Sequence, residues 1–452
     1  MNLPQQLDAT AIAGRTGNST RLPSKIGEVI LGNYSFARDK AKNLYYFENG
    51  VYKEGGEFVV EQLYKVWLRQ NGDMDVWKDT TGLKVVKWIL TEERCKELWE
   101  RPPLGTINLL NGLYDWEQNI LNPHAAGHLS TIQIPIVYDA EAECPMWDQF
   151  LHEVLPIKGG EDYLRQIVGL CLTPFTGVQK CIVLVGGGSN GKSTFLNALQ
   201  KVIGLDNISN IPLHVLTNPL ERFSRSGIVG KLANIFGDLS KKKIEDVSNF
   251  KALVGEDRLL IEQKHKDAFY YTPFCKLIFS CNEVVASDDE SAGYKRRFVN
   301  IPFTQKFKGD PKLGLELAEK LTTTDELSGL FNKVAPLIRK VINEGFTTSP
   351  EVASVIDDWC VIPDSIQAWI DMVLVVEEGA VLHVEGFYGY YVETAPPDDL
   401  PREHGKLIKY IRHLYGVQVR PVEINGQVEM CYVGVRTKAR EMGEVWMKGV
   451  RL

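Results

Sequence analysis

Short apolar runs that alternate with stretches of helical spacing mark the middle of the chain. Residues 181–185 are continuously apolar, and residues 195–199 resume with apolar positions at helical spacing. Residues 231–238 and 276–282 repeat the pattern, because each is an apolar run that ends in a polar residue. Continuous apolar runs are typical of strands that are buried on both faces of a parallel sheet. The pattern predicts an α/β core, a parallel sheet flanked by helices, over residues 181–345.

Aromatic and apolar runs around tight turns mark the first part of the chain. Two such runs flank Asn49-Gly50, a pair that predicts a β-hairpin. Residues 58–69 have apolar positions at helical spacing, and residues 107–115 form a second candidate hairpin. These elements predict an α+β N-terminal region over residues 1–140. We favour a hydrophobic core as the role of its aromatic residues, and a base-stacking platform is the open alternative.

Helical spacing returns on both sides of the α/β core. Residues 141–180 contain two amphipathic stretches and predict a helical lead-in, and residues 346–377 predict a helical linker. Beyond them, residues 378–452 carry a helical stretch and two short strand-like runs joined at Asn425-Gly426. This order predicts a C-terminal winged-helix-like domain. One side of its predicted helix is basic, and whether that side contacts DNA or a neighbouring protein stays open; the residues are Lys406, Lys409, Arg412 and His413.

A glycine-rich motif, G-x-x-x-x-G-K-S, follows the apolar run at residues 181–185 and precedes the next helical stretch. In this context the glycines let backbone N–H groups turn towards phosphate oxygens, and the helix adds its positive end. We expect Lys192 to reach the β- and γ-phosphates and the Ser193 hydroxyl to coordinate Mg²⁺. The motif therefore predicts a bound nucleoside triphosphate, in our interpretation ATP, with Mg²⁺. The predicted ATP-binding residues are Gly186, Gly188, Ser189, Asn190, Gly191, Lys192, Ser193 and Thr194.

Further polar groups at strand ends suit phosphoryl transfer. Asp238 ends the second predicted strand, where a carboxylate can hold Mg²⁺ and orient the attacking water; a helix cap is the alternative. Asn282 ends the third predicted strand, where its amide can contact the γ-phosphate. The alternative is that Asn282 is only a turn residue.

A pair of arginines, Arg296 and Arg297, precedes another apolar run. Arginine neutralises the charge of phosphoryl transfer and is often supplied by a neighbouring subunit, whereas a solvated basic pair is the alternative. The predicted catalytic residues are Lys192, Asp238, Asn282, Arg296 and Arg297, and the predicted Mg²⁺ ligands are Ser193 and Asp238.

Between the second and third predicted strands, apolar and aromatic residues flank a basic tip made of Lys264, His265 and Lys266. This arrangement predicts a hairpin whose tip presents positive charge to a nucleic-acid backbone. A charged hairpin tip that is only solvated is the alternative interpretation.

Composition narrows the class of protein. The 452 residues are 44% hydrophobic and 24% charged, which is typical of a globular chain of several domains. The net charge of −7 excludes a surface that is basic all over, but it leaves room for a basic lumen inside an acidic ring. Eight cysteines without a C-x-x-C pair argue against zinc ribbons and disulfide scaffolds. With no membrane-length apolar run and no secretory signal pattern, we expect a cytoplasmic protein, in the host cell if viral.

Taken in order, these motifs resemble the helicase portion of phage and plasmid primase–helicases, superfamily 3 AAA+ proteins that include the poxvirus primase-helicase. The segments that carry the resemblance include Asn111-Gly112 to Asp115, Cys144-Pro145-Met146-Trp147, the phosphate loop, Lys231 to Leu239, Phe250 to Asp257, Phe279 to Asn282 and Arg296 to Phe303.

The resemblance implies an AAA+ P-loop ATPase core and a hexameric ring around single-stranded nucleic acid, with ATP-driven 3′→5′ translocation. It further implies that Lys264 to Lys266 line the channel, that Asn282 is a sensor, and that Arg296 or Arg297 acts in trans. Two departures limit it. Many relatives have a second acid beside the position of Asp238, which leaves open which group polarises water here. Nothing in the sequence matches an N-terminal primase domain, so the chain is a helicase-only protein or part of a longer one.

These observations predict a replicative DNA helicase of a phage or mobile element. Its expected partners are single-stranded or forked DNA, further copies of the same chain, and a primase or polymerase, with no membrane. The alternative is a DNA-binding or origin-recognition module that nucleotide switches without processive unwinding. DNA-stimulated strand separation distinguishes them, because only the helicase requires it.

Overall fold

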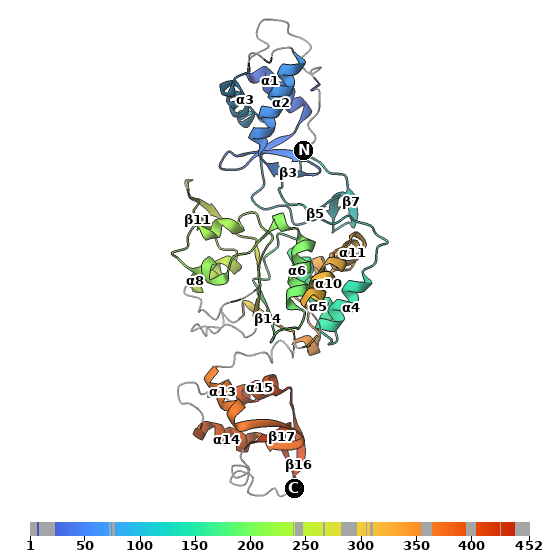
Figure 1. Cartoon of the computed structure of the whole chain (residues 1–452), viewed down its shortest axis with the longest axis vertical. Helices are drawn as coiled ribbons and strands as arrows, with labels where there is room; N and C mark the ends of the chain where they lie inside the picture. Colours follow the sequence, from blue (N-terminus) through green and yellow to red (C-terminus); the bar gives the residue numbers. More distant parts are fainter. Residues whose placement is uncertain are drawn as a thin grey trace.

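The computed structural model describes residues 7–8, 23–71, 74, 77–237, 239, 247–264, 267–281, 296–303, 305–307, 311–353, 364–394, 404–424 and 426–438. Its central feature is a five-stranded sheet in the order β14-β8-β13-β10-β9. The edge strand β14 is labelled in Figure 1. Every neighbouring pair in this sheet is parallel. The predicted parallel sheet flanked by helices is therefore confirmed. Its strands are β8 (Cys181–Val185), β9 (Ile208–Ser209), β10 (Ala233–Phe236), β13 (Lys276–Cys281) and β14 (Phe298–Pro302).

Both faces of this sheet are buried, because successive side chains of a strand point to opposite faces. In β8, Ile182 and Leu184 belong to one hydrophobic cluster, while Cys181, Val183 and Val185 belong to another. The first cluster is shared with the larger helical layer: α4 (Pro145–Val154), α5 (Gly160–Cys171), α6 (Lys192–Ile203), α10 (Pro311–Lys320) and α11 (Thr324–Glu344). The second is shared with α7 (Leu213–Thr217) and α8 (Val247–Val254). This burial explains the uninterrupted apolar runs in the sequence.

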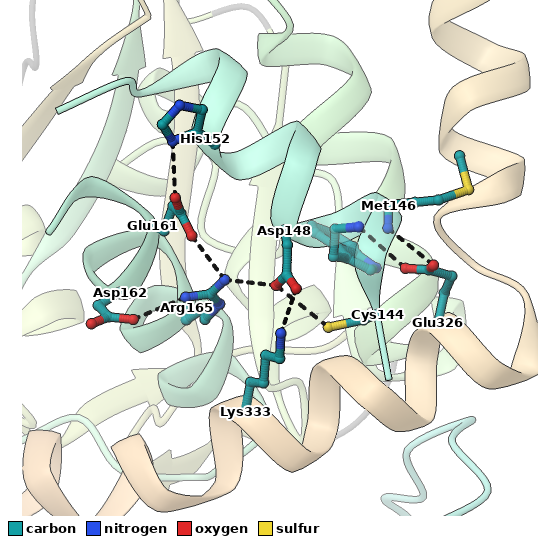
Figure 2. Close-up of polar contacts among 10 residues, drawn as sticks. Cys144, Met146, Asp148, His152, Glu161, Asp162, Arg165, Glu326 and Lys333 are labelled. Carbon is teal, nitrogen blue, oxygen red and sulfur yellow. Dashed lines mark hydrogen bonds and ion pairs between the residues drawn. The ribbon is translucent and has the colours of Figure 1, made fainter. Parts of the chain in front are cut away.

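An ion-pair network joins the helical lead-in to α11 (Figure 2). The guanidinium of Arg165 is buried and donates to Asp148 at 2.7 Å and to Asp162 at 2.9 Å. Lys333, on α11, pairs with the other oxygen of Asp148. Glu326 accepts hydrogen bonds from the first backbone N–H groups of α4, at 3.1 and 3.2 Å, so a carboxylate from another helix caps this helix.

The first part of the chain contains α1 (Pro23–Asn33), β1 (Phe36–Arg38), β2 (Leu44–Glu48), β3 (Val51–Glu54), α2 (Gly56–Gln70), α3 (Asp79–Thr91) and β4 (Lys96–Glu97). The strands form one sheet in the order β3-β2-β1-β4. The turn between β2 and β3 places Asn49 at φ 52° and Gly50 at φ 87°, as a tight hairpin requires. The predicted hairpin is confirmed.

A second small sheet, β5 (Thr106–Leu109), β6 (Gly112–Asp115) and β7 (Ile120–Asn122), contains the second predicted hairpin. Its apolar residues share the larger cluster of the central sheet. The ring of Tyr114 meets that of Phe331 on α11 edge-on, with centroids 5.0 Å apart. A separate hydrophobic cluster of the N-terminal helices and strands ends along the chain at Cys95, and the larger cluster of the central sheet begins at Ile107.

The last part comprises α13 (Asp364–Val373), β15 (Leu374–His383), α14 (Val384–Thr394), α15 (His404–Tyr415), β16 (Gln418–Ile424) and β17 (Gln427–Thr437). Its antiparallel sheet has the order β15-β17-β16. The predicted helix and two-stranded ribbon are confirmed, whereas the winged-helix assignment stays a prediction. The helical linker expected over residues 346–377 is wrong at its end, because residues 374–377 belong to β15, where the β-branched Val375 and Val376 pair with β17.

Candidate nucleotide-binding site

The glycine-rich loop lies at the carboxyl end of β8 and leads directly into α6, so the context that the motif requires is confirmed. Two of its glycines are needed for their backbone conformation, since Gly188 has φ 95° and Gly191, which precedes the helix, has φ 87°. A Cβ atom at Gly186 would lie 2.3 Å from the Phe303 carbonyl oxygen. The motif glycines therefore follow from the geometry of the loop.

Lys192 is held inside the loop. Its side chain is buried, and Nζ donates to the carbonyl oxygen of Gly186 and to Oδ1 of Asn190, the latter at 3.1 Å. Asn190 in turn donates through Nδ2 to the Phe303 carbonyl at 2.8 Å. Burial lowers the pKa of Lys192, with the nearby Cys281 thiol acting in the opposite direction. An ammonium that is poorly solvated in this way gains from an anionic partner such as a phosphate.

Ser193 and Thr194 form the first turn of α6 behind Lys192. Ser193 is exposed and Thr194 is half-buried. Gly314 on α10 lies close by, because a Cβ atom there would lie 2.9 Å from the Thr194 hydroxyl oxygen. An exposed hydroxyl at the start of a helix suits a Mg²⁺ ligand, which keeps Ser193 as the candidate.

The tips of the two adjacent strands meet at the edge that carries the loop. Cys281, the last residue of β13, pairs with Val185 in parallel register, and its carbonyl accepts the Gly186 N–H at 3.1 Å. Next to it, the chain after β10 is fixed to Ser280, whose hydroxyl donates to the Gly237 carbonyl and whose carbonyl accepts the Leu239 N–H at 2.8 Å.

Asp238 and Asn282 themselves lie outside the described residues. Asn282 directly follows β13, and Asp238 follows β10 after Gly237. Both strands end at this edge, which is where ligands of open parallel sheets bind. The Mg²⁺ role of Asp238 and the sensor role of Asn282 stay predictions.

The two arginines stand at the opposite end of the sheet. Arg296 and Arg297 directly precede β14, whose first residue, Phe298, pairs with Cys181 at the start of β8. The five residues of β8 separate that end from the phosphate loop by about 17 Å. Arg296 is exposed, and Arg297 is half-buried. The structure therefore does not bring the arginines to the phosphate loop of the same chain.

The predicted hairpin is present as β11 (Leu259–Ile261) and β12 (Phe269–Tyr271), which pair in antiparallel register (Figure 1). Lys264 is exposed at its tip, and His265 and Lys266 lie outside the described residues. An ion pair of 3.4 Å between Arg222 and Glu262 ties the hairpin to the loop before β10. Contact with nucleic acid stays a prediction.

Sequence reasoning placed Asn190 in the nucleotide site but missed its role in fixing the loop. Its side chain links Lys192 to the carbonyl of Phe303, which lies over a hundred residues further along the chain. A local sequence pattern cannot predict a hydrogen bond to a carbonyl oxygen so far along the chain. The sequence signal that could have indicated this partner is the position of Phe303 at the end of an apolar run.

Comparisons with known proteins bear on this site. Residues 96–156 match the family described as D5 N terminal like, and residues 184–297 match a family described as of unknown function, DUF5906. A protein named putative helicase L207/L206, from Acanthamoeba polyphaga mimivirus, is 28% identical over 212 residues, 44% of this chain. The chain is similar to a putative viral helicase. It spans 22% of the length of that relative.

Solved structures provide a further likeness. An apo structure of the NrS-1 C terminal region matches with a TM-score of 0.48 and 12% identity, covering 91% of this chain and 99% of that one. A second apo structure of the same region has a TM-score of 0.45 and 11% identity, with 91% of this chain and 99% of that one covered.

Among the helices that the structure describes, none combines the length and the apolar character that crossing a membrane requires.

Proposed function

We propose that this chain is the ATPase and helicase part of a viral or phage replication protein, with an AAA+ core of superfamily 3. The observation that carries the proposal is the phosphate loop, closed around a buried lysine at the carboxyl edge of a parallel sheet. The similarity to a putative viral helicase supports the same function.

ATP binds at the loop in this proposal. Lys192 exchanges its carbonyl and amide partners for the β- and γ-phosphates, and the backbone N–H groups at the start of α6 hold the remaining oxygens. Ser193 and Asp238 would hold Mg²⁺, which would supply positive charge to neutralise the phosphate oxygens. Asn282 contacts the γ-phosphate or the attacking water.

Neighbouring copies complete the site. Because Arg296 and Arg297 precede β14 at the end of the sheet opposite the phosphate loop, a neighbouring copy brings one of them to the γ-phosphate in this proposal. A head-to-tail contact of this kind closes into a ring when the rotation between copies permits it. We propose a hexamer that surrounds single-stranded DNA, with the tip at Lys264, His265 and Lys266 facing the strand.

ATP turnover then drives movement. Binding brings the neighbour's arginine onto the γ-phosphate, and release after hydrolysis shifts the hairpin and the strand it contacts. The proposed direction is 3′→5′, on single-stranded or forked DNA, with a primase or polymerase as partner. The proposed reaction is therefore ATP hydrolysis coupled to strand separation.

The decisive experiment uses purified chain, ATP, Mg²⁺ and a forked DNA with a labelled strand. We expect ATP-dependent displacement of that strand by the wild type and loss of both displacement and ATP hydrolysis in Lys192→Ala. Retained hydrolysis in this variant would show that the phosphate loop is misread. Nucleotide-dependent DNA binding without displacement would favour the switched binding module instead.

A further inference from the structure

Three side chains that are far apart in the sequence meet at the amino end of the central sheet. Arg101 Nη2 lies 3.0 Å from Glu256 Oε1 and donates to the Thr176 hydroxyl at 2.6 Å. The Thr176 hydroxyl also donates to the same oxygen of Glu256. Arg101 and Glu256 are each 33% exposed, and Thr176 is buried. These residues form a closed set of contacts, the Arg101–Thr176–Glu256 triad.

The triad holds a strained turn. Glu256 has φ 64°, in the left-handed region that side chains other than glycine, asparagine and aspartate rarely adopt. Gly255 before it leaves no room for a side chain, because a Cβ atom there would lie 2.6 Å from the Lys251 carbonyl oxygen. A glycine would adopt the conformation of residue 256 without cost. Glu256 therefore adopts a conformation that its backbone disfavours, and its carboxylate makes the contacts that offset this.

The electrostatics of the triad agree with this geometry. Burial raises the pKa of Glu256, but the hydrogen bond from Thr176 and the charge of Arg101 outweigh it, so the pKa lies below its ordinary value. Arg101 also lies over the ring of Phe274, 5.9 Å from its centroid, just before β13. The carboxylate is thus held ionised between elements that flank the sheet.

The turn stands between the two groups that the proposed function needs to connect. On one side it follows α8 and leads into β11, the first strand of the hairpin. On the other side Arg297 reaches it, since a Cβ atom at Gly255 would lie 3.6 Å from Nη2 of Arg297. The rings of Phe250 on α8 and Phe298 on β14 stack with centroids 4.8 Å apart and planes at 12°. A displacement of Arg297 would therefore shift the turn at residues 255–257 and, with it, the base of the hairpin.

We propose that the Arg101–Thr176–Glu256 triad is a positioning device that couples the arginine end of the sheet to the nucleic-acid hairpin. It fixes the turn at residues 255–257 to the segments before β5 and β8, so that the turn moves with the sheet rather than with α8 alone. In this proposal the triad acts through the turn and binds neither nucleotide nor nucleic acid. The proposal rests on the proposed function, because it assigns the hairpin and Arg297 the roles given above.

The test uses the full chain and measures hydrogen exchange over residues 259–271 with and without a non-hydrolysable ATP analogue and a single-stranded oligonucleotide. In the wild type we expect the analogue to change the exchange of the hairpin. In Arg101→Met and Glu256→Gly we expect that change to be lost. Glu256→Gly also removes the left-handed strain, so this variant keeps the turn and its fold.

Kinetics provide the second readout. We expect DNA-stimulated ATP hydrolysis to fall about tenfold in both variants, the size of a typical coupling between sites, while hydrolysis without DNA changes by less than about twofold. Arg101→Lys keeps the charge and one hydrogen bond and should recover part of the stimulation. The double variant should lose no more than either single variant. Arg94→Met is the matched control, because it breaks an exposed ion pair of 2.5 Å that joins the turn after α3 to Glu28 on α1.

Two results would overturn the proposal. One is a wild-type hairpin whose exchange does not respond to the analogue, or that responds equally in the variants. The other is an equal loss of basal and stimulated hydrolysis together with a lower melting temperature, which would make the triad merely structural. Failure of the proposed function would give a different result. The wild-type chain would never displace a strand, although the analogue would still change the hydrogen exchange of the hairpin in the wild type and not in the variants.

Discussion

Lys276 offers a prediction whose size follows from the structure. This lysine begins β13 and is 3% exposed, and its ammonium donates to the carbonyl oxygens of Thr173 and, at 3.3 Å, of Phe274. Burial lowers its pKa from 10.5 to about 8, with smaller opposing effects from the Cys171 and Cys275 thiols. We therefore expect the folded chain to hold this proton less tightly than the unfolded chain.

The difference sets the expected change in stability with pH. A pKa of about 8 in place of 10.5 corresponds to about 3 kcal/mol. Between these values the unfolded chain binds the proton and the folded chain does not, so stability rises with pH. Below a pH of about 8 the folded chain carries the full cost of the buried charge, and the cost fades as the pH approaches 10.5.

Lys276→Met removes this cost and keeps most of the side-chain volume. It also leaves two carbonyl oxygens without their donor, at about 1–3 kcal/mol each, so its stability at neutral pH is not the diagnostic quantity. The diagnostic is the difference between wild type and variant, which should move by about 2–3 kcal/mol in favour of the wild type from pH 7 to pH 10.

Denaturant titrations followed by tryptophan fluorescence at a series of pH values would measure this difference. Groups common to both chains, such as the other buried thiols and tyrosines, largely cancel. Lys340→Met, which removes an exposed ammonium from α11, is the matched control. If the difference between wild type and Lys276→Met stays constant from pH 7 to pH 10, Lys276 titrates alike in the folded and unfolded chains and the reasoning fails.

Three further predictions concern the proposed function. Lys264→Ala with Lys266→Ala should reduce DNA-stimulated ATP hydrolysis but spare basal hydrolysis; an equal loss of both would count against the channel role. Arg296→Ala or Arg297→Ala subunits, mixed into wild-type chain, should lower activity more steeply than their fraction, and simple proportional dilution would argue against an arginine supplied in trans. Gly191→Ala forces a side chain into a left-handed position at φ 87°, so we expect a loss of about 1–2 kcal/mol in thermal unfolding and weaker binding of labelled ATP; unchanged values of both would contradict the loop geometry.

The central sheet and its phosphate loop could be predicted from the sequence because local rules determine them. A strand buried on both faces must be apolar throughout, and residues 181–185 are. Gly188 and Gly191 are required by their positive φ, and Gly186 is required by the close approach of the Phe303 carbonyl. The turn at Asn49-Gly50 follows the same logic, since both residues adopt positive φ.

The contacts that join distant segments could not be predicted in this way. Arg101 and Glu256 are 155 residues apart, and each alone reads as an exposed charge. Lys276 stands at the start of a strand, where a lysine is normally solvated, and only the fold shows that carbonyl oxygens surround it. Tyr114 was expected in the core of an N-terminal region, whereas its ring packs on Phe331 of α11. In each case the partner is set by tertiary packing, to which no spacing rule applies.

The residues with proposed functional roles lie at opposite ends of the central sheet, and this separation affects how the proposed helicase would work. The phosphate loop occupies the carboxyl end, while the arginines, the triad and the base of the hairpin occupy the amino end. Parallel strands that are hydrogen-bonded along their length and buried on both faces deform little, so the sheet can transmit a rigid movement from one end to the other. A nucleotide held at the carboxyl end of one copy would then act on the amino end of its neighbour, where the hairpin begins. On this argument a single copy can bind ATP but cannot couple it to DNA, so hydrolysis that is stimulated by DNA should rise with protein concentration more steeply than basal hydrolysis does.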